Sequence, residues 1–466
     1  MKKINIFLWI IFGGLLISPF SRGYAEGSRP WRLRDALGLP DWITFSVNHR
    51  TRYETLNNTF RAHTSGDDQI LAFRTLVLGE IRFRGFRLGG ELEDSRIALD
   101  SPGTPVNTTL VNQVELLQAY LAWEGRDVFG SGLDLGVKGG RLTMDFGSRR
   151  LIARNRFRNT LNGFDGIDFN LSRAGEWQWR SFFVFPVTRL PGDAEALRRG
   201  QTQFDEENGA TFFIGTFLGL DRLPLDSRGE LYAYYLHEED THHHPIATKN
   251  RKLWTPGVRW YRKPDTGRFD FEFEAALQTG SSRASKTSTD SLDHFAYFGH
   301  AAVGYTFDLP WRPRFLVQYD YASGDEDPND GDHDRFDTLF GARRFEFGPT
   351  SIWGAFARGN LNSPGFRVQV KPAPTVDGFF AYRAFWLAEK RDAWTGAGLR
   401  DASGGSGGFL GHQIEIRTRW HVIPALMTLE AGWAHLFKGK FARNAPDAPN
   451  QRGDSNYFYS QTIITF

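Results

Sequence analysis

The sequence lacks cysteine altogether, in a chain of 466 residues. Disulfide frameworks, thiolate nucleophiles and cysteine-based zinc sites are thereby excluded. Beyond residue 20 it also lacks any run of about 18 apolar residues, and its mean hydropathy is −0.42, so a bundle of transmembrane helices is excluded as well. The sequence shows no Ser/His/Asp arrangement of recognisable context and no phosphate-binding glycine loop. We therefore expect no enzyme, no cofactor, no metal and no nucleic-acid partner.

Lysine is scarce, although the chain is rich in charge. There are 45 Arg against 11 Lys, and the formal net charge is only +2. Lysine solvates an ordinary surface equally well, so this preference favours forked recognition of planar anions such as carboxylates. Aromatic residues make up 15% of the chain, which is too much apolar surface for a disordered protein.

The N-terminus has the features of a secretory signal. Lys2 and Lys3 form a basic start, residues 4–17 are apolar, and Gly23 and Ala25 place small residues before a cleavage site. This pattern predicts a Sec-type signal peptide over residues 1–25, cleaved after Ala25. A membrane anchor, the alternative, would need a longer apolar stretch.

A two-residue period of apolar and polar side chains recurs along the chain. In one copy, Phe269, Phe271 and Phe273 alternate with Asp270 and Glu272. Such alternation indicates β-strands with two chemically different faces. A soluble sandwich turns the polar face to water, whereas a transmembrane barrel turns the apolar face to lipid and the polar face to a lumen.

The gaps between these segments decide between sandwich and barrel. Long gaps such as 147–163 and 323–363 alternate strictly with short ones such as 85 and 309–311. A barrel with long outer loops and short periplasmic turns explains this alternation. The predicted fold class is therefore all-β, an antiparallel up-and-down transmembrane barrel of about 18 strands. The expected strands are 43–55, 70–84, 86–95, 114–124, 133–146, 164–171, 177–187, 210–219, 229–238, 254–262, 268–279, 295–308, 312–322, 364–371, 378–389, 410–422, 426–438 and 456–466.

These segments divide the chain into three parts. Residues 1–25 are the expected signal peptide, residues 26–42 an N-terminal tail in the periplasm, and residues 43–466 the barrel. The chain ends on Phe466, in phase with the apolar face of its last strand. An aromatic residue at this place suits the interfacial girdle of a barrel. The expected location is the outer membrane of a Gram-negative bacterium.

Arginine recurs on the lumen-facing phase of the expected strands. Such side chains would line a pore for an anionic solute, or acids on the same phase, such as Glu80 and Glu272, would neutralise them. We favour the pore, because neutralisation alone does not explain the deficit of lysine. The arginines on this phase are Arg52, Arg74, Arg141, Arg180, Arg259, Arg314, Arg367, Arg383, Arg417 and Arg419.

A second basic cluster lies in the gap after the fifth expected strand, where five arginines occur between residues 149 and 158. On an outer loop, this cluster would either fold into the mouth of the barrel or bind lipopolysaccharide phosphates. We expect it to fold inward, and we count Arg150, Arg154 and Arg158 among the pore residues.

An acidic stretch, residues 325–334, holds six carboxylates in ten residues. Calcium binds through oxygen ligands of this kind. However, Gly331 lies one place too late for an EF-hand loop counted from Asp325, and no glutamate closes the loop. We therefore predict a solvated loop rather than a metal site.

Two blocks of the sequence carry more specific motifs. One is Gly140-Arg141-Leu142-Thr143 with Phe146-Gly147-Ser148-Arg149-Arg150-Leu151 and residues 158–166, and the other is Tyr319-Asp320-Tyr321-Ala322-Ser323-Gly324-Asp325 with residues 336–341 and 360–361. In both blocks the sequence resembles the alginate export family of outer-membrane proteins. The resemblance implies a monomeric barrel of eighteen strands, whose arginine-rich constriction passes a polyuronate. Within the motif it carries over one pore residue, Arg141.

The sequence thus predicts an outer-membrane porin that passes an alginate-like polyuronate outward through an arginine-lined pore. A porin for small carboxylates or other anionic solutes remains open, and an outer-membrane hydrolase is a third interpretation. The hydrolase would need Ser and His on adjacent strands at the membrane face. The expected partners are outer-membrane lipid and lipopolysaccharide, an anionic polysaccharide or small anion, and periplasmic export components.

Overall fold

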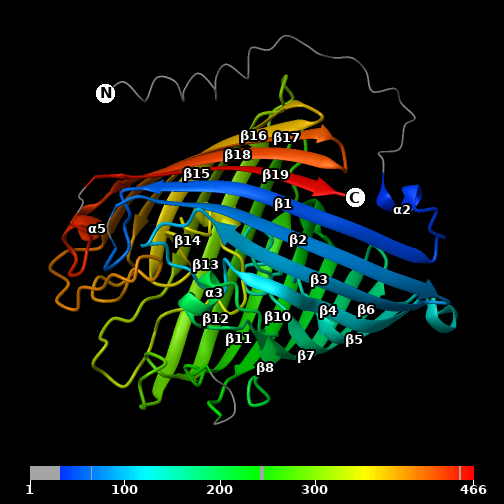
Figure 1. Ribbon diagram of the computed structural model, residues 1–466, viewed down its shortest axis with the longest axis horizontal. Helices are drawn as coiled ribbons and strands as arrows, with labels where there is room; N and C mark the ends of the chain where they lie inside the picture. Colours follow the sequence, from blue (N-terminus) through cyan, green and yellow to red (C-terminus); the bar gives the residue numbers. More distant parts are fainter. Residues whose placement is uncertain (1–31, 65, 242–245, 451–452) are drawn as a thin grey trace.

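The computed structural model describes residues 32–64, 66–241, 246–450 and 453–466. Within these residues, eighteen long antiparallel strands form a closed barrel (Figure 1). Each strand of the wall pairs with its neighbour in the chain, and β1 (Ile43–Asn57) pairs with β19 (Ser455–Thr465) to close the wall. The predicted fold class is confirmed. A short two-residue strand, β8 (Glu206–Glu207), pairs antiparallel with the last two residues of β7.

The strands between β1 and β19 follow the chain in order. They are β2 (Asp68–Phe83), β3 (Phe86–Ala98), β4 (Asn112–Gly125), β5 (Asp134–Leu142), β6 (Phe164–Arg173), β7 (Trp177–Thr188), β9 (Phe212–Leu223), β10 (Ser227–His237), β11 (Lys252–Arg262), β12 (Phe269–Ser282), β13 (Leu292–Thr306), β14 (Arg314–Ala322), β15 (Leu361–Ala373), β16 (Val376–Trp386), β17 (Phe409–Ile423) and β18 (Met427–Lys438).

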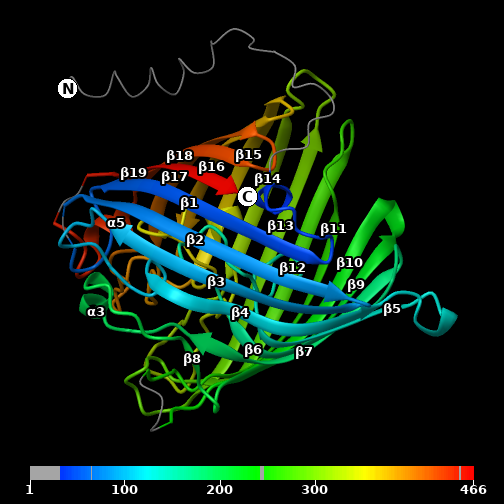
Figure 2. The same cartoon turned by 45° about the vertical axis from the view of Figure 1, so that its right-hand side comes forward.

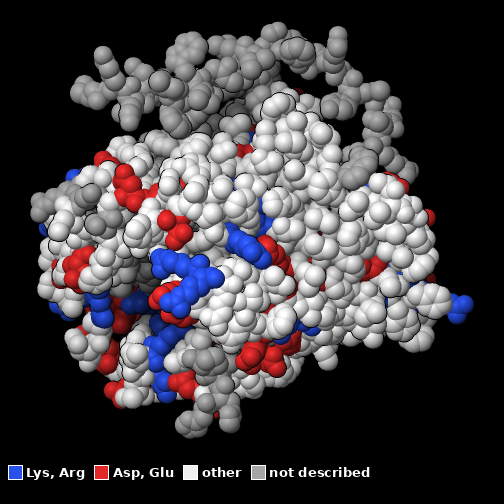
Figure 3. Space-filling view, viewed as in Figure 1, with Lys and Arg blue, Asp and Glu red and all other residues white. Residues whose placement is uncertain are grey.

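The two faces of the wall follow the period of the sequence. Along β12, the side chains of Phe269, Phe273 and Leu277 are exposed on the outside, whereas Asp270 and Glu274 are buried. Successive strand residues point to opposite faces, so the apolar set meets lipid and the polar set meets the lumen. In the space-filling view, charged side chains gather toward the loop end near α3 (Ala194–Arg198), and the barrel wall is mostly white (Figure 3).

The connections alternate as predicted. Turns such as 84–85 and 374–375 join strands at one end, which we call the turn end, and long loops join them at the other, which we call the loop end. The short helix α2 (Leu33–Ala36) lies beside the start of β1 at the turn end (Figure 2). The expected signal peptide, residues 1–25, lies outside the described residues. Within the described chain, no helix is long and apolar enough to cross a membrane.

Two loops enter the barrel and build a core inside it. These are residues 143–163, called loop 3, and residues 323–360, called loop 7. In loop 7, Trp353 packs edge-on against Phe60 with ring centroids 5.3 Å apart, and Phe356 stacks on Phe385 at 3.5 Å. The apolar core therefore lies within the barrel, near the loop end, and it fixes the loops against the wall.

One expected strand is shorter than predicted. The segment 133–146 leaves the wall after Leu142, and Met144 and Phe146 are buried in the interior instead. Phe146 packs against Phe182 with ring centroids 5.1 Å apart. An apolar residue in an alternating pattern can face either lipid or an interior core. The alternation therefore continues to residue 146, although the strand ends at Leu142.

Candidate functional site

Arginines of the first two strands hold loop 3 inside the barrel. Arg50 Nη1 donates to the backbone oxygen of Arg156 at 3.0 Å, and its Nη2 donates to that of Arg158 at 3.1 Å. Arg74 Nη1 donates to the same two oxygens at 2.9 and 3.0 Å. Backbone carbonyls are strong acceptors that need partners when they are buried. The two guanidinium groups therefore act as braces for the loop backbone.

Arg52 has a similar position. Its Nε donates to Glu54 Oε1 at 2.7 Å and its Nη1 to the backbone oxygen of Phe157 at 2.7 Å. Its guanidinium also lies over the Phe157 ring. Both side chains of the ion pair are fully buried. The inward fold of loop 3 agrees with expectation, and the predicted pore residues Arg52 and Arg74 lie behind the loop, against the wall.

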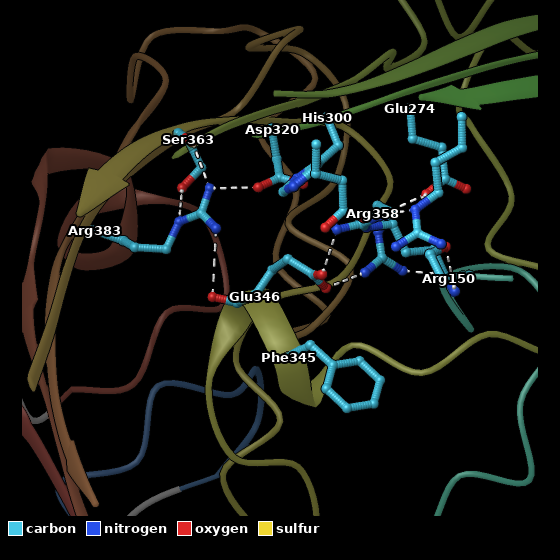
Figure 4. Close-up of polar contacts among 12 residues, drawn as sticks. Arg150, Glu274, His300, Asp320, Phe345, Glu346, Arg358, Ser363 and Arg383 are labelled. Carbon is cyan, nitrogen blue, oxygen red and sulfur yellow. Dashed lines mark hydrogen bonds and ion pairs between the residues drawn. The ribbon is translucent and has the colours of Figure 1, made fainter. Parts of the chain in front are cut away.

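Loop 3 and loop 7 meet at a buried group of three ionised side chains, which we call the barrier. Glu346, on the short helix α4 (Arg344–Phe347) of loop 7, lies 2.9 Å from Arg150 Nη2 of loop 3 and accepts from Arg358 Nη2 at 2.5 Å (Figure 4). Although burial opposes it, the guanidinium groups of Arg150 and Arg358 hold the pKa of Glu346 below its usual range. The barrier is therefore a charged link between the two loops.

The wall extends this network on both sides of the barrier. Arg150 Nη1 also donates to Glu274 Oε2 of β12 at 2.5 Å. On the other side, Arg383 of β16 donates to Asp320 Oδ2 at 2.8 Å and to Ser363 Oγ at 2.9 Å. His300 Nδ1 lies 2.8 Å from the second oxygen of Asp320 (Figure 4). Arg383 Nη1 also donates to the backbone oxygen of Glu346 at 3.4 Å, so the predicted residues Arg150 and Arg383 lie in one connected cluster.

A cavity of about 450 Å³, which we call the turn-side cavity, lies on the side of the barrier that faces the turn end. Arg150 and Glu346 form part of its wall, and it is also lined by Arg262 at the end of β11 and by residues 263–264 of the turn that follows. Six basic and four acidic side chains line it: Arg150, Arg259, Arg262, Lys263, Arg314 and Arg367, with Glu230, Asp270, Glu272 and Glu346.

A second cavity of about 300 Å³, the loop-side cavity, lies beyond Arg358 and is enclosed by outer loops. Four arginines line it, Arg158, Arg189, Arg343 and Arg358, and none of the described residues around it is acidic. Since Arg358 belongs to the barrier, the barrier separates the two cavities. The remaining polar lining comes from Thr109, Asn155, Asn162, Thr338, Thr350 and Ser351.

The other predicted pore residues are paired with acids on the wall. Arg141 holds Asp165 through a fork with both N···O distances at 2.9 Å. Arg154 donates to Glu91 at 2.6 Å, and Arg419 donates to Glu430 at 2.8 Å. Arg417 pairs with Asp377. These four side chains lie around the lumen wall and do not line either cavity.

Sequence reasoning missed Glu346, Arg358, Arg189 and Arg343. All four lie on loops, where no two-residue period shows which way a side chain points. Only the residue type could have identified these positions from the sequence. Because the chain has 45 arginines, being an arginine does not single out a functional residue.

The acidic stretch of loop 7 has an exposed middle and buried ends. Glu326, Asp327 and Asp330 are exposed, whereas Asp325 and His333 are buried. Burial and the neighbouring Asp392 raise the pKa of Asp325 to about 6. The exposed middle agrees with the predicted solvated loop.

Solved structures of similar fold are outer-membrane proteins of Pseudomonas aeruginosa. OccD3 (OpdP) matches with a TM-score of 0.57 and 10% identity over 91% of each chain. The outer membrane protein opdK matches with a TM-score of 0.57 and 11% identity, over 91% of this chain and 99% of the other. OccK9 (OpdG) matches with a TM-score of 0.56 and 11% identity, over 91% of this chain and 98% of the other. A search of curated proteins found no significant match.

The closed barrel and its polar lumen define an outer-membrane porin. The sequence matches the alginate export family over residues 41–454, and the chain belongs to that family. Family and fold point to a channel that performs no chemistry on its solute.

Proposed function

We propose that this porin passes an anionic, alginate-like polysaccharide outward through its basic lumen. The observation that carries the proposal is the excess of basic over acidic side chains among the described residues that line the cavities. It is six against four in the turn-side cavity and four against none in the loop-side cavity. A low-dielectric cleft with one sign of charge concentrates counter-ions. Arginine adds forked hydrogen bonds that fit a carboxylate. We place the barrel in the outer membrane with its long loops toward the cell exterior, so that the turn-side cavity faces the periplasm.

Passage requires weak contacts repeated along the path. A uronate chain carries one carboxylate on each sugar unit, and each unit can exchange one arginine for the next. Binding that is distributed over several sites allows both entry and release. The barrier lies across this path, so loops 3 and 7 must separate, or Glu346 must give up its arginines, before a polymer can pass.

The expected surroundings follow from this proposal. The apolar outer face would contact outer-membrane lipid and lipopolysaccharide, and the turn end would meet periplasmic export components that deliver the polymer. We propose that the chain works as a monomer.

A second candidate is a porin for small carboxylates. The barrier favours it, because the two separate cavities of about 450 and 300 Å³ are of a size for small solutes. The third interpretation, a hydrolase, finds less support. Ser282 Oγ and His333 Nδ1 lie 2.8 Å apart, but both side chains are buried, and His333 belongs to loop 7 itself.

Reversal potential under a salt gradient, in planar bilayers, tests the proposal. The wild type is expected to be anion-selective, and Arg367→Glu in the turn-side cavity should move the reversal potential toward cation selectivity. Arg199→Glu is the matched control, since Arg199 is exposed directly after α3 and lies outside both cavities. Oligouronates should block the current more strongly than neutral oligosaccharides of equal length. A cation-selective wild type would contradict the proposal, and equal block by monomers and oligomers would favour small carboxylates.

A further inference from the structure

We propose that Lys390 and Lys440, at the loop end of strands β16 to β18, bind the phosphate groups of lipopolysaccharide in the outer leaflet of the membrane. The inference deepens the proposed contact with lipopolysaccharide, and it rests on the proposed function only for the orientation of the barrel. The site itself rests on three features: an aromatic girdle on the lipid face, two exposed lysines beside the girdle, and acids that are engaged elsewhere.

The aromatic girdle lies on the lipid face of β16, β17 and β18 near the loop end. Trp386 packs against Phe409 with ring centroids 5.2 Å apart, and Phe409 packs against His412 at 5.0 Å. Phe437 lies opposite His412 in the strand register and is exposed. Rings at the end of a barrel wall lie at the level of the lipid headgroups. The girdle therefore marks the level at which phosphates of the outer leaflet meet the barrel.

The two lysines follow this girdle directly in the chain. Lys390 comes four residues after Trp386, in the loop between β16 and β17, and it is exposed. Lys440 comes three residues after Phe437 and is also exposed; it begins the short helix α5 (Lys440–Asn444) at the loop end (Figure 1). Both ammonium groups therefore lie just beyond the apolar band of the wall.

The tip of the loop between β16 and β17 brings the two lysines together. Lys440 Nζ lies 3.5 Å from the backbone oxygen of Gly405. The side chain of Lys390 runs along Gly404, where an added β-carbon would lie 3.1 Å from its Cε. Gly404 has a φ of +70°, a left-handed conformation that glycine adopts without strain. Because these two positions carry no side chain, both lysines reach the same short stretch of backbone.

Neither lysine is neutralised by an acid. Within the described part of the chain, neither forms an ion pair. Glu389 precedes Lys390, but burial, Glu326 and Asp392 raise the pKa of its carboxyl. A lysine within reach would lower that pKa instead. Glu389 therefore does not compensate Lys390.

The other acids of these loops have partners of their own. Arg400, exposed on the same loop, lies close enough to act on the buried Asp325, so we assign the site to the lysines alone. The remaining acids are Asp392, which pairs with Arg335; Asp401, which accepts from the backbone and hydroxyl of Ser403; and Asp454, which pairs with Arg443.

A phosphorylated glycolipid fits both parts of this surface at once. Its phosphates would meet Lys390 and Lys440, because exposed basic side chains beside a membrane attract anionic headgroups. Its acyl chains would continue down the wall over Phe409 and Phe437. Lysine binds phosphate as a point charge, so the site does not need the planar fork of arginine. A free anion would use the lysines and leave the girdle uncovered.

Thermophoresis of the whole purified protein in detergent, titrated with diphosphorylated lipid A, tests the site. Wild type should bind this lipid more tightly than its dephosphorylated form, and salt should weaken the binding. Lys390→Gln combined with Lys440→Gln should weaken binding about tenfold or more, since each charge adds to the attraction. Lys286→Gln combined with Lys371→Gln removes two exposed lysines from other parts of the chain and should leave the affinity unchanged.

Two further variants separate charge from structure. Lys390→Arg combined with Lys440→Arg keeps both charges and should retain most of the affinity. Phe437→Ala should weaken binding a few-fold and leave the preference for the phosphorylated lipid intact. Folding of each variant is checked by its heat-modifiable mobility on gels.

Equal binding of the phosphorylated and dephosphorylated lipids by the wild type would overturn the assignment. Wild-type affinity in the double Gln variant would do the same. Displacement of lipid A by equal concentrations of inorganic phosphate or oligouronate would overturn the choice of a lipid. A cation-selective pore that binds lipid A in the expected way would refute the proposed function and leave the site standing.

Discussion

The two cavities differ in how their arginines are compensated. In the turn-side cavity, Arg259 donates to Glu230 at 2.9 Å and Arg314 donates to Asp270 at 2.9 Å. In the loop-side cavity, Arg158 and Arg343 meet no carboxylate among the described residues. An arginine paired with an acid contributes mainly to the wall. An arginine without one keeps its charge and its donors for a solute, so the comparison separates structural from binding arginines.

The difference has a simple origin in the sheet. Arg259 of β11 lies opposite Glu230 of β10 and opposite Glu274 of β12 in the strand register. Cross-strand neighbours of opposite charge stabilise each other, so the register itself neutralises the wall. Loops have no such register. Burying a charge without an acid is costly, and sites that accept this cost are frequently functional.

The largest effect is expected at the barrier, where the two cavities meet. Glu346→Gln would leave Arg358 buried without its carboxylate, and breaking a buried pair in this way costs about 3–5 kcal/mol. The thermal midpoint, followed by far-UV circular dichroism, should fall, and single-channel conductance should rise as loops 3 and 7 separate. Glu195→Gln on the exposed helix α3 is the control and should change neither. Unchanged stability and conductance would mean that the barrier does not hold the loops together.

A smaller effect on stability and selectivity is expected when an arginine of the wall loses an acidic partner. Asp165→Asn removes the charge from the fork that holds Arg141, at a cost of about 1.5–3 kcal/mol for charged hydrogen bonds. Glu115 still accepts from Arg141 Nη1 at 2.9 Å, so the guanidinium loses one of the two acids that hold it. This partial release should make the pore more anion-selective, measured as a shift in reversal potential. Asp94→Asn, which removes an acid paired with the exposed Arg96, should not shift it. Equal shifts in both variants would show that net charge alone sets selectivity.

The loop between β7 and β9 should respond to pH. Burial and the neighbouring Glu115 raise the pKa of Asp205 to about 7. The unfolded value is about 3.9, so the folded loop holds the proton more tightly and its stability falls as pH rises from about 4 to about 7. Hydrogen exchange of residues 189–211 should therefore accelerate over this range, after correction for intrinsic rates. Asp205→Asn should remove the dependence, and a pH-dependent exchange that persists in this variant would refute the assignment.

Single cysteine substitutions are expected to have the smallest effect, and they test which end of the barrel faces the cell exterior. The chain has no cysteine, so single cysteines can be placed at the exposed Asp330 of loop 7 and at the exposed Lys263 by the turn-side cavity. On intact cells, a bulky membrane-impermeant maleimide should label Asp330→Cys and not Lys263→Cys, without a change in stability. Both variants should react once the cells are lysed. Labelling of Lys263→Cys alone on intact cells would reverse the proposed orientation.

Much of the fold could be predicted from the sequence alone. Alternating side chains such as Phe269 and Asp270 report directly on the two faces of a strand, because successive residues of a strand must point to opposite sides. The alternation of long and short gaps adds the topology. The end of β5 at Leu142 could not be predicted, since Phe146 continues the same pattern while packing against the interior rather than lipid.

The candidate site is less visible in the sequence. Arg383 was predicted from its lumen-facing phase and Arg150 from the basic cluster after the fifth expected strand, and they meet at the barrier region. Arg52 and Arg74 share that phase, yet their donors hold the backbone of loop 3. Phase shows that a side chain points inward, but it does not show what occupies the interior there.

By itself, therefore, the sequence determined the barrel, the order of its strands and the abundance of arginine in its lumen, because these follow from local period and composition. Only the tertiary structure decided which arginines have no ion pair among the described residues. Arg158, Arg189 and Arg343 are far apart in the chain and come together only when three loops fold over one cavity. Charge compensation depends on distances between such segments, and no local pattern encodes those distances.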